Sequence, residues 1–173
     1  IERYLTEGYK RVKIKIEPGW DIEPVKEVRK HFGNVPLMVD ANAAYCRNDI
    51  SLFQQLDEFD LIMFEQPLAK SDLEGHAELQ AKVRTPVCLD ESAADIAAVK
   101  KAISLGSCKI INIKVQRMGG LGKSKEVHDL FQQANQSNLA LLFSLRHDFP
   151  NEWSAFVNDE NGAKMYGEAV HFR

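Results

Sequence analysis

The sequence contains few cysteines and no long hydrophobic segment, and both absences limit what the chain can be. Its three cysteines are odd in number and have no metal-type spacing, which favours reduced thiols in a cytoplasmic protein. No apolar stretch approaches the roughly 20 residues that a membrane-spanning helix needs, so we expect no membrane partner. The histidines share no common spacing, and we expect surface positions for His31, His76, His128 and His147.

A strong excess of charge is also absent. The formal net charge is −3, and Lys and Arg do not cluster, which argues against a nucleic-acid partner. The nucleotide-binding patterns G-x-G-x-x-G and G-x-x-x-x-G-K-[ST] are missing as well. With 45% hydrophobic and 27% charged residues, the composition is that of an ordinary globular domain.

What the sequence does contain is a repeat of short apolar runs, each ending in a charged residue. The charged residues are Lys15, Asp40, Glu65, Asp90 and Lys114, and successive ones lie 25, 25, 25 and 24 residues apart. Such a period accommodates one strand, one helix and two short loops. The runs are continuously apolar, as expected for parallel strands that helices cover. We expect strands near residues 11–16, 36–40, 61–65, 86–90, 109–114 and 139–144.

The segments between these strands carry the spacing of amphipathic helices. Ile22, Val25 and Val28 recur at helical spacing, and Gly33 follows the segment as a typical helix end. Similar spacings follow near residues 50–56, 73–80, 96–103 and 127–134. The sequence therefore predicts alternating strands and helices, which is an α/β fold.

A barrel explains the repeat better than an open doubly wound sheet. Charged residues from five successive strand ends converge only if the sheet curves towards itself, and (β/α) barrels carry their active sites at those ends. A full barrel needs about 250 residues, so we predict an incomplete TIM-type barrel of about six βα units. It spans residues 1–144 and lacks the last strands. Residues 145–173 lack the period and are predicted to be irregular, and the start at Ile1 suggests a part of a longer protein.

Three carboxylates stand at neighbouring strand ends in this arrangement. Asp40, Glu65 and Asp90 would repel one another and take up protons unless a cation lay among them. Mg²⁺ suits such an all-oxygen site, with Mn²⁺ as an alternative. A competing interpretation is that each acid caps the helix that follows it. The even spacing and the flanking lysines favour the metal site.

The lysines on either side of the carboxylates predict proton transfer. Lys13 and Lys15 are two residues apart on a strand and therefore share a face. Inside a barrel, burial and neighbouring positive charge would both favour a neutral Lys15 amine, as a general base requires. The alternative is an edge strand with solvated lysines. Because Lys114 lies on the other side of the acids, the arrangement suits proton abstraction beside a carboxylate, with a cation stabilising the enediolate.

Taken together, these motifs resemble those of the enolase superfamily. In chain order they are Lys-Ile-Lys-Ile-Glu-Pro-Gly-Trp-Asp (13–21), Asp-Ala-Asn-Ala-Ala-Tyr (40–45), Glu-Gln-Pro-Leu (65–68), Leu-Asp-Glu-Ser (89–92), Asn-Ile-Lys (112–114) and Arg-Met-Gly-Gly (117–120). Within the muconate-lactonizing subgroup they are most similar to the o-succinylbenzoate synthase and N-acylamino acid racemase group. The resemblance runs from about residue 8 to about residue 135.

The resemblance implies a role for each residue of the constellation. Mg²⁺ would be held by Asp40, Glu65 and Asp90. Lys15 would take the α-proton and return it to the departing hydroxyl, while Lys114 would stabilise the enediolate or act as a second acid/base. Residues implied to orient the ligands are Lys13, Asn42 and Glu91.

The implied reaction is an Mg²⁺-dependent dehydration of a small-molecule cyclohexadiene carboxylate to o-succinylbenzoate, a step of menaquinone biosynthesis. Racemisation of N-acylamino acids at the same site is an alternative, because both reactions begin with the same proton abstraction. The family's N-terminal capping domain has no counterpart here, and Leu-Arg-His-Asp-Phe-Pro (145–150) replaces a Gly-rich segment of the family. A third alternative is therefore an inactive, truncated barrel, which would form homo-oligomers or aggregate through its open strand edges.

Overall fold

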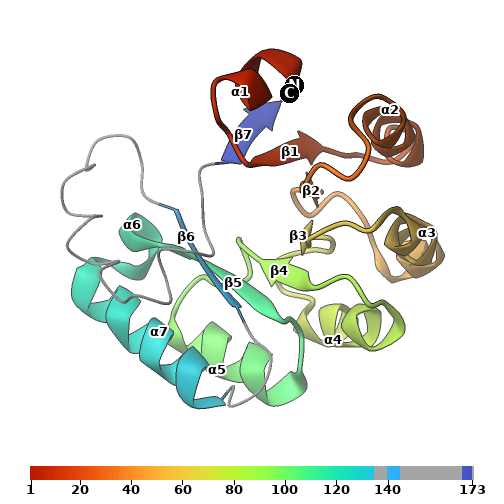
Figure 1. Cartoon of the computed structure of the whole chain (residues 1–173). Coiled ribbons are helices and arrows are strands. Elements are labelled where there is room, and N and C mark those ends of the chain that lie inside the picture. The colour runs from red at the N-terminus through yellow and green to blue at the C-terminus, as the bar shows by residue number, and fades with distance from the viewer. Residues whose placement is uncertain (135–139, 145–168, 173) are drawn as a thin grey trace.

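The computed structural model describes residues 1–134, 140–144 and 169–172. Within these residues, parallel strands form one curved sheet in the order β6-β5-β4-β3-β2-β1-β7, shown in Figure 1. The strands are β1 (Arg11–Lys15), β2 (Leu37–Asp40), β3 (Phe64–Glu65), β4 (Val87–Leu89), β5 (Ile110–Lys114), β6 (Ala140–Ser144) and β7 (Ala169–Phe172). β6 and β7 are the edge strands of the part of the sheet described.

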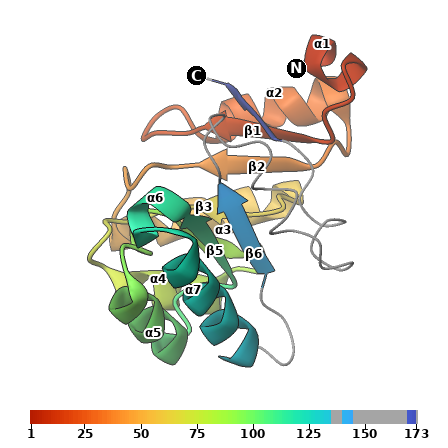
Figure 2. The ribbon, with the colours of Figure 1, turned by 90° about the vertical axis from the view of Figure 1, so that its left-hand side faces the viewer.

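Helices connect the strands and lie along the outer side of the curve (Figures 1 and 2). They are α2 (Ile22–Phe32), α3 (Ile50–Leu56), α4 (Leu73–Lys82), α5 (Ile96–Leu105) and α7 (Leu121–Ala134). The shorter elements are α1 (Glu2–Thr6), α6 (Val115–Met118) and the 3-10 turns η1 (Arg47–Asp49) and η2 (Asp57–Phe59). The predicted α/β repeat of strand and helix is confirmed. None of the helices described is long and apolar enough to cross a membrane.

Aspartates and a glycine fix where these helices begin and end. Asp72 Oδ1 accepts a hydrogen bond from Gly75 N at 2.9 Å and so caps α4, and Asp95 Oδ1 caps α5 through Ala98 N at 2.8 Å. α5 ends at Gly106, whose φ of 68° lies in the left-handed region that glycine adopts without strain. The first turns of α4 and α5 and the last turn of α5 are therefore held at defined residues.

Two apolar clusters lie on the two sides of the sheet. The larger one fills the space between sheet and helices, where Phe53 packs edge-to-face on Tyr45 and Phe64 at ring-centroid distances of 5.1 and 5.2 Å. The smaller one is formed by Met38, Met63, Cys88 and Ile110. Each member precedes a polar residue by two positions in the chain, so the cluster fills the inner side directly below these polar residues.

The structure differs from the sequence prediction at two strands. β3 is only two residues long, although the apolar run 61–65 predicted five. β7 lies in the stretch predicted to be irregular and pairs in parallel with β1, from Arg11↔Ala169 to Ile14↔Phe172. A strand of four residues outside the repeat leaves no periodic pattern from which to predict it. Residues 145–168 lie outside the described residues, so the predicted boundary at residue 144 stays a prediction.

The three cysteines predict a simple pattern of thiol reactivity. Cys46 is exposed, whereas Cys88 and Cys108 are buried. Burial raises the pKa of Cys108 to about 12 and that of Cys88 well above its usual value. Because the thiolate is the reactive form, we expect one fast-reacting thiol per native chain and three after unfolding, measured with a chromogenic disulfide reagent. Cys46→Ser should remove the fast phase, and a second fast thiol in the native chain would contradict the burial.

Candidate active site

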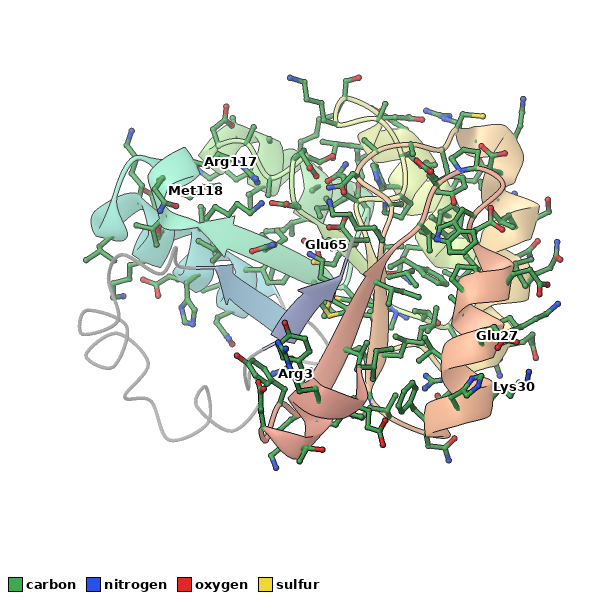
Figure 3. The ribbon with its side chains drawn as sticks, turned by 90° about the horizontal axis from the view of Figure 1, so that it is seen from above. Arg3, Glu27, Lys30, Glu65, Arg117 and Met118 are labelled. Carbon is green, nitrogen blue, oxygen red and sulfur yellow. The ribbon has the colours of Figure 1, made fainter. Side chains whose placement is uncertain are left out.

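The residues predicted from the repeat come together on the inner side of the sheet, at the carboxyl ends of β1 to β5. Lys15 pairs with Asp40 in the strand register, and Asp40 pairs with Glu65. Asp40, Glu65 and Asp90 are only 4%, 1% and 3% exposed. Figure 3 shows Glu65 within the curve of the sheet, whereas Glu27 and Lys30 lie outside on α2. Buried carboxylates of this kind need charged or hydrogen-bonding partners.

Lys13 is the partner of two of these carboxylates. Its Nζ donates to Glu65 Oε2 at 2.6 Å and lies 3.0 Å from Asp40 Oδ2. Burial acts to lower the pKa of Lys13, but the attraction of Glu65 and Asp40 outweighs it and the pKa is raised. Burial also raises the pKa of Glu65, with Asp40 acting in the same direction and Lys13 against it. One ammonium facing two carboxylates accounts for both directions.

Asp90 is held from the other side by two cations. Lys114 Nζ donates to its Oδ2 at 2.5 Å, and Arg117 Nη2 donates to its Oδ1 at 2.6 Å. Arg117 Nη1 also donates to the Asp90 backbone carbonyl. Arg117 belongs to the Arg-Met-Gly-Gly motif (117–120), which by itself predicts no role for the residue. Arg117 lies three residues after Lys114, in the short helix α6 that directly follows β5. That position indicates a role beside the strand end.

Asn112 is a second polar residue of the centre, and the Asn-Ile-Lys motif (112–114) alone predicts no role for it. It is 4% exposed, and its Nδ2 donates to Glu65 Oε1 at 3.1 Å. Its Oδ1 has no hydrogen-bond partner among the described residues. A polar residue in the apolar run 110–113, two positions before Lys114, shares the inward face of that lysine. That spacing was sufficient to predict it as a site residue.

Lys15 differs from the expectation of a buried base. It is the last residue of β1, and its side chain is 43% exposed. Its Nζ donates to Asn42 Oδ1 and lies 3.9 Å from Asp40 Oδ2. The expected burial of Lys15 is therefore wrong. The buried lysine is Lys13, which also contradicts the alternative of an edge strand carrying two solvated lysines.

Asn42 contacts Asp40, and Glu91 directly follows Asp90 in the chain. Asn42 has a φ of 43°, and its backbone N donates to Asp40 Oδ1 at 3.1 Å. Its Nδ2 lies 3.5 Å from Glu91 Oε1. Glu91 Oε2 is buried and has no hydrogen-bond partner within the residues described. Asn42 thereby joins the backbone after β2 to Lys15 and to the loop after β4.

The donor atoms fit a hard divalent cation, although ammonium groups lie between them in the structure. No group of three His, Cys, Asp or Glu residues in the described part of the chain has the spacing of a metal site. Lys13 and Lys114 contact the carboxylate oxygens instead. Three buried carboxylates on adjacent strands nevertheless form the all-oxygen donor set that Mg²⁺ prefers.

The interpretation of the acids as helix caps is wrong. The helices that follow these acids are α3, α4 and α5, and their N-cap residues are Asp49, Asp72 and Asp95, which lie several residues beyond the strand ends. Asp40, Glu65 and Asp90 are thus left free to face the inner side of the sheet.

His76 corrects the expectation of surface histidines. It is fully buried, its Nε2 accepts a hydrogen bond from Leu68 N at 3.1 Å, and its Nδ1 donates to Asp72 O at 2.7 Å. Burial lowers the pKa of His76, which keeps the imidazole neutral in this role. The residue fixes the loop between Glu65 and α4. His31 is exposed, as predicted.

A cavity of about 710 Å³ lies next to the site, above the starts of α4 and α5. Glu91, Ser92 and Arg117 line it, together with Lys70 and Lys101. Asp40, Glu65 and Asp90 do not line it. The cavity therefore lies beside the loop that follows β4 and does not contain the three carboxylates.

The fold and the site together define a (β/α)-barrel type of domain with an acidic centre flanked by lysines. The chain belongs to the family described as Enolase C-terminal domain-like, which matches residues 1–142. It is 55% identical over 130 residues to an o-succinylbenzoate synthase of Geobacillus kaustophilus, covering 75% of this chain and 35% of that protein. It is 52% identical over 128 residues to an N-succinylamino acid racemase of Amycolatopsis sp., covering 73% and 35%.

A solved structure shares the architecture. The L-talarate dehydratase of Polaromonas sp. JS666, complexed with Mg and L-glucarate, superposes with a TM-score of 0.81 at 26% identity, over 99% of this chain and 47% of that chain. The chain spans about a third of the length of the curated relatives it matches.

The different burial of Lys13 and Lys15 predicts different effects on stability. Lys13→Met leaves two buried carboxylates without their shared cation, so we expect a loss of about 3–5 kcal/mol in the free energy of unfolding. Lys15→Met removes a partly exposed hydrogen bond to Asn42 and a contact with Asp40 at 3.9 Å, and should cost at most about 1 kcal/mol. Urea unfolding of both variants without divalent metal measures the difference. Equal losses would contradict the role given to Lys13.

Proposed function

We propose that this chain carries the catalytic centre of an Mg²⁺-dependent lyase that dehydrates a cyclohexadiene carboxylate to o-succinylbenzoate, in cytoplasmic menaquinone biosynthesis. The observation that carries the proposal is the convergence of three buried carboxylates between Lys15 and Lys114. The similarity to a protein named o-succinylbenzoate synthase supports the choice of substrate. The unpaired cysteines are compatible with a reducing compartment.

Asp40, Glu65 and Asp90 would hold the Mg²⁺ ion, with Mn²⁺ as an alternative. When bound, the ion would stabilise the negative charge that develops on the substrate carboxylate. A rigid site in which the protein supplies every ligand is not needed for this, because Mg²⁺ commonly retains water and substrate oxygens as ligands. Asn42 would support Asp40 through its backbone N, and its side chain contacts Glu91 in the loop after β4.

Lys15 would transfer the proton. Its amine lies at the open end of β1, hydrogen-bonded to Asn42, where a substrate can reach it. In the dehydration, the neutral amine takes the α-proton, the carbon–oxygen bond to the hydroxyl breaks, and Lys15 returns the proton so that water leaves. Lys114, held beside Asp90, would supply positive charge on the opposite side.

Racemisation of N-acylamino acids is the second candidate, and two observations favour it. Lysines on opposite sides of the carboxylates suit a reaction in which one lysine removes a proton and the other delivers one to the opposite face. A relative named N-succinylamino acid racemase is nearly as similar to this chain as the synthase is. The third candidate is a chain without activity of its own, which associates through the sheet edges at β6 and β7.

The two reactions are separated by assaying both substrates. We expect dehydration by a chimaera in which this chain's matched segment replaces that of the Geobacillus kaustophilus synthase. Racemisation of N-succinylamino acids without dehydration would overturn the first candidate. The 173-residue chain is assayed alone in parallel, with its mass measured by light scattering. Turnover by a monomer of that chain would exclude the third candidate.

Replacing Lys15 tests its assignment as the base. In the chimaera, Lys15→Ala should reduce turnover by about 10²–10⁴-fold, as removal of a general base does. Mn²⁺ affinity should stay close to that of the parent, because Lys15 lies beside the carboxylates and does not bridge them. Lys26→Ala is the control, since Lys26 is exposed on α2 and pairs only with Glu23 at 2.8 Å among the contacts described. Retention of more than about a hundredth of the rate would refute the assignment.

A further inference from the structure

Gln66 is a buried polar residue to which the proposed reaction gives no role. It follows Glu65 directly and is 0% exposed. Its φ is 40°, in the left-handed region that residues with side chains seldom adopt. Such a backbone conformation persists only where the surrounding contacts impose it. The contacts of Gln66 show what imposes it here.

The side-chain amide of Gln66 makes four hydrogen bonds. Its Oε1 accepts from Asp90 N at 2.9 Å and from Ser92 N at 3.0 Å. Its Nε2 donates to Leu68 O at 3.0 Å and to Ser92 Oγ at 2.7 Å. Backbone N–H groups only donate and carbonyl groups only accept, so these partners fix which end of the amide is oxygen. The side chain thus holds the backbone on both sides of the Asp90 carboxylate.

The backbone of Gln66 extends this connection to β4 itself and to the loop that follows β2. Gln66 N donates to Cys88 O at 2.8 Å, and Gln66 O accepts from Ala43 N at 2.8 Å. Next to these bonds, Ala41 N donates to Glu65 O at 3.0 Å. The loops that follow Asp40, Glu65 and Asp90 are therefore joined at one residue.

We propose that Gln66 is a positioning residue that sets the spacing of the Asp40, Glu65 and Asp90 carboxylates and thereby the affinity of the chain for a divalent cation. The inference rests on the proposed function, because it takes these carboxylates as metal ligands. β3 pairs through only two residues, Phe64 and Glu65. Its strand pairing alone therefore restrains the position of the Glu65 carboxylate only weakly. The amide of Gln66 supplies that control.

Gln80 offers a matched control within the same chain. It is 8% exposed on α4, its Oε1 accepts from Val87 N at 2.7 Å, and its Nε2 lies 3.4 Å from Val83 O and Thr85 O. It therefore holds the backbone of β4 as Gln66 does, but at the start of the strand. The same substitution at both positions separates loss of stability from loss of positioning.

The experiment measures Mn²⁺ binding to the metal-free chain by titration calorimetry and by the Mn²⁺ electron paramagnetic resonance spectrum. Gln66→Met should weaken Mn²⁺ binding by about 10–100-fold, as loss of a group supporting metal ligands does. Gln80→Met should leave the affinity unchanged while lowering the thermal stability measured in chelator. Gln66→Glu keeps the oxygen that faces Asp90 N and Ser92 N, but it can donate to Leu68 O only as a protonated carboxyl group, so it should recover part of the affinity, with Gln80→Glu controlling for the added carboxyl group.

Equal weakening by Gln66→Met and Gln80→Met, or none by either, would overturn the inference while leaving the metal site in place. A parent chain that binds no Mn²⁺ would overturn the proposed metal site, and the inference with it. If Gln66→Met does not fold, Ser92→Ala replaces it, because that change removes only the contact with Gln66 Nε2. Mn²⁺ affinity at the parent level in folded Ser92→Ala would then overturn the inference.

Discussion

The site depends on the buried contact of the Lys13 ammonium with Asp40 and Glu65. Without that cation, two carboxylates on adjacent strands would face each other in a region that water hardly reaches, and the inner side of the sheet would be electrostatically unfavourable. With it, β1, β2 and β3 can present charged groups towards a common centre. The same ion pairs therefore stabilise both the polar inner side of the sheet and the parallel register of β1, β2 and β3.

Side chains alternate between the two faces of the sheet along each strand, and this alternation separates the charged groups from the apolar core. On β2, Met38 and Asp40 face inwards, while Leu37 and Val39 pack against the helices. A slip of one residue in the register would bury the carboxylate among the apolar side chains and turn the apolar ones inwards. The register is therefore fixed from both faces, by packing outside and by ion pairs inside.

The sequence predicted the strands and the three carboxylates because both follow a period, and a period can be recognised without knowing any contact. It did not predict what depends on contacts between distant residues. The burial of Lys13 and the exposure of Lys15 follow from where β1 ends relative to β2, and His76 is buried because its ring joins Leu68 to Asp72. β7 gave no pattern at all, since its place beside β1 depends on pairing over a long stretch of chain.

The order of the groups along the chain has a consequence for assembly. Lys13 and all three carboxylates lie within residues 13–90, whereas the cations that contact Asp90 come from Lys114 and Arg117. A growing chain therefore acquires the negative charges of the centre before it acquires the groups that balance Asp90. The docking of β5 and α6 onto β4 both extends the sheet and brings Lys114 and Arg117 to Asp90, so one docking step adds a strand and balances that charge.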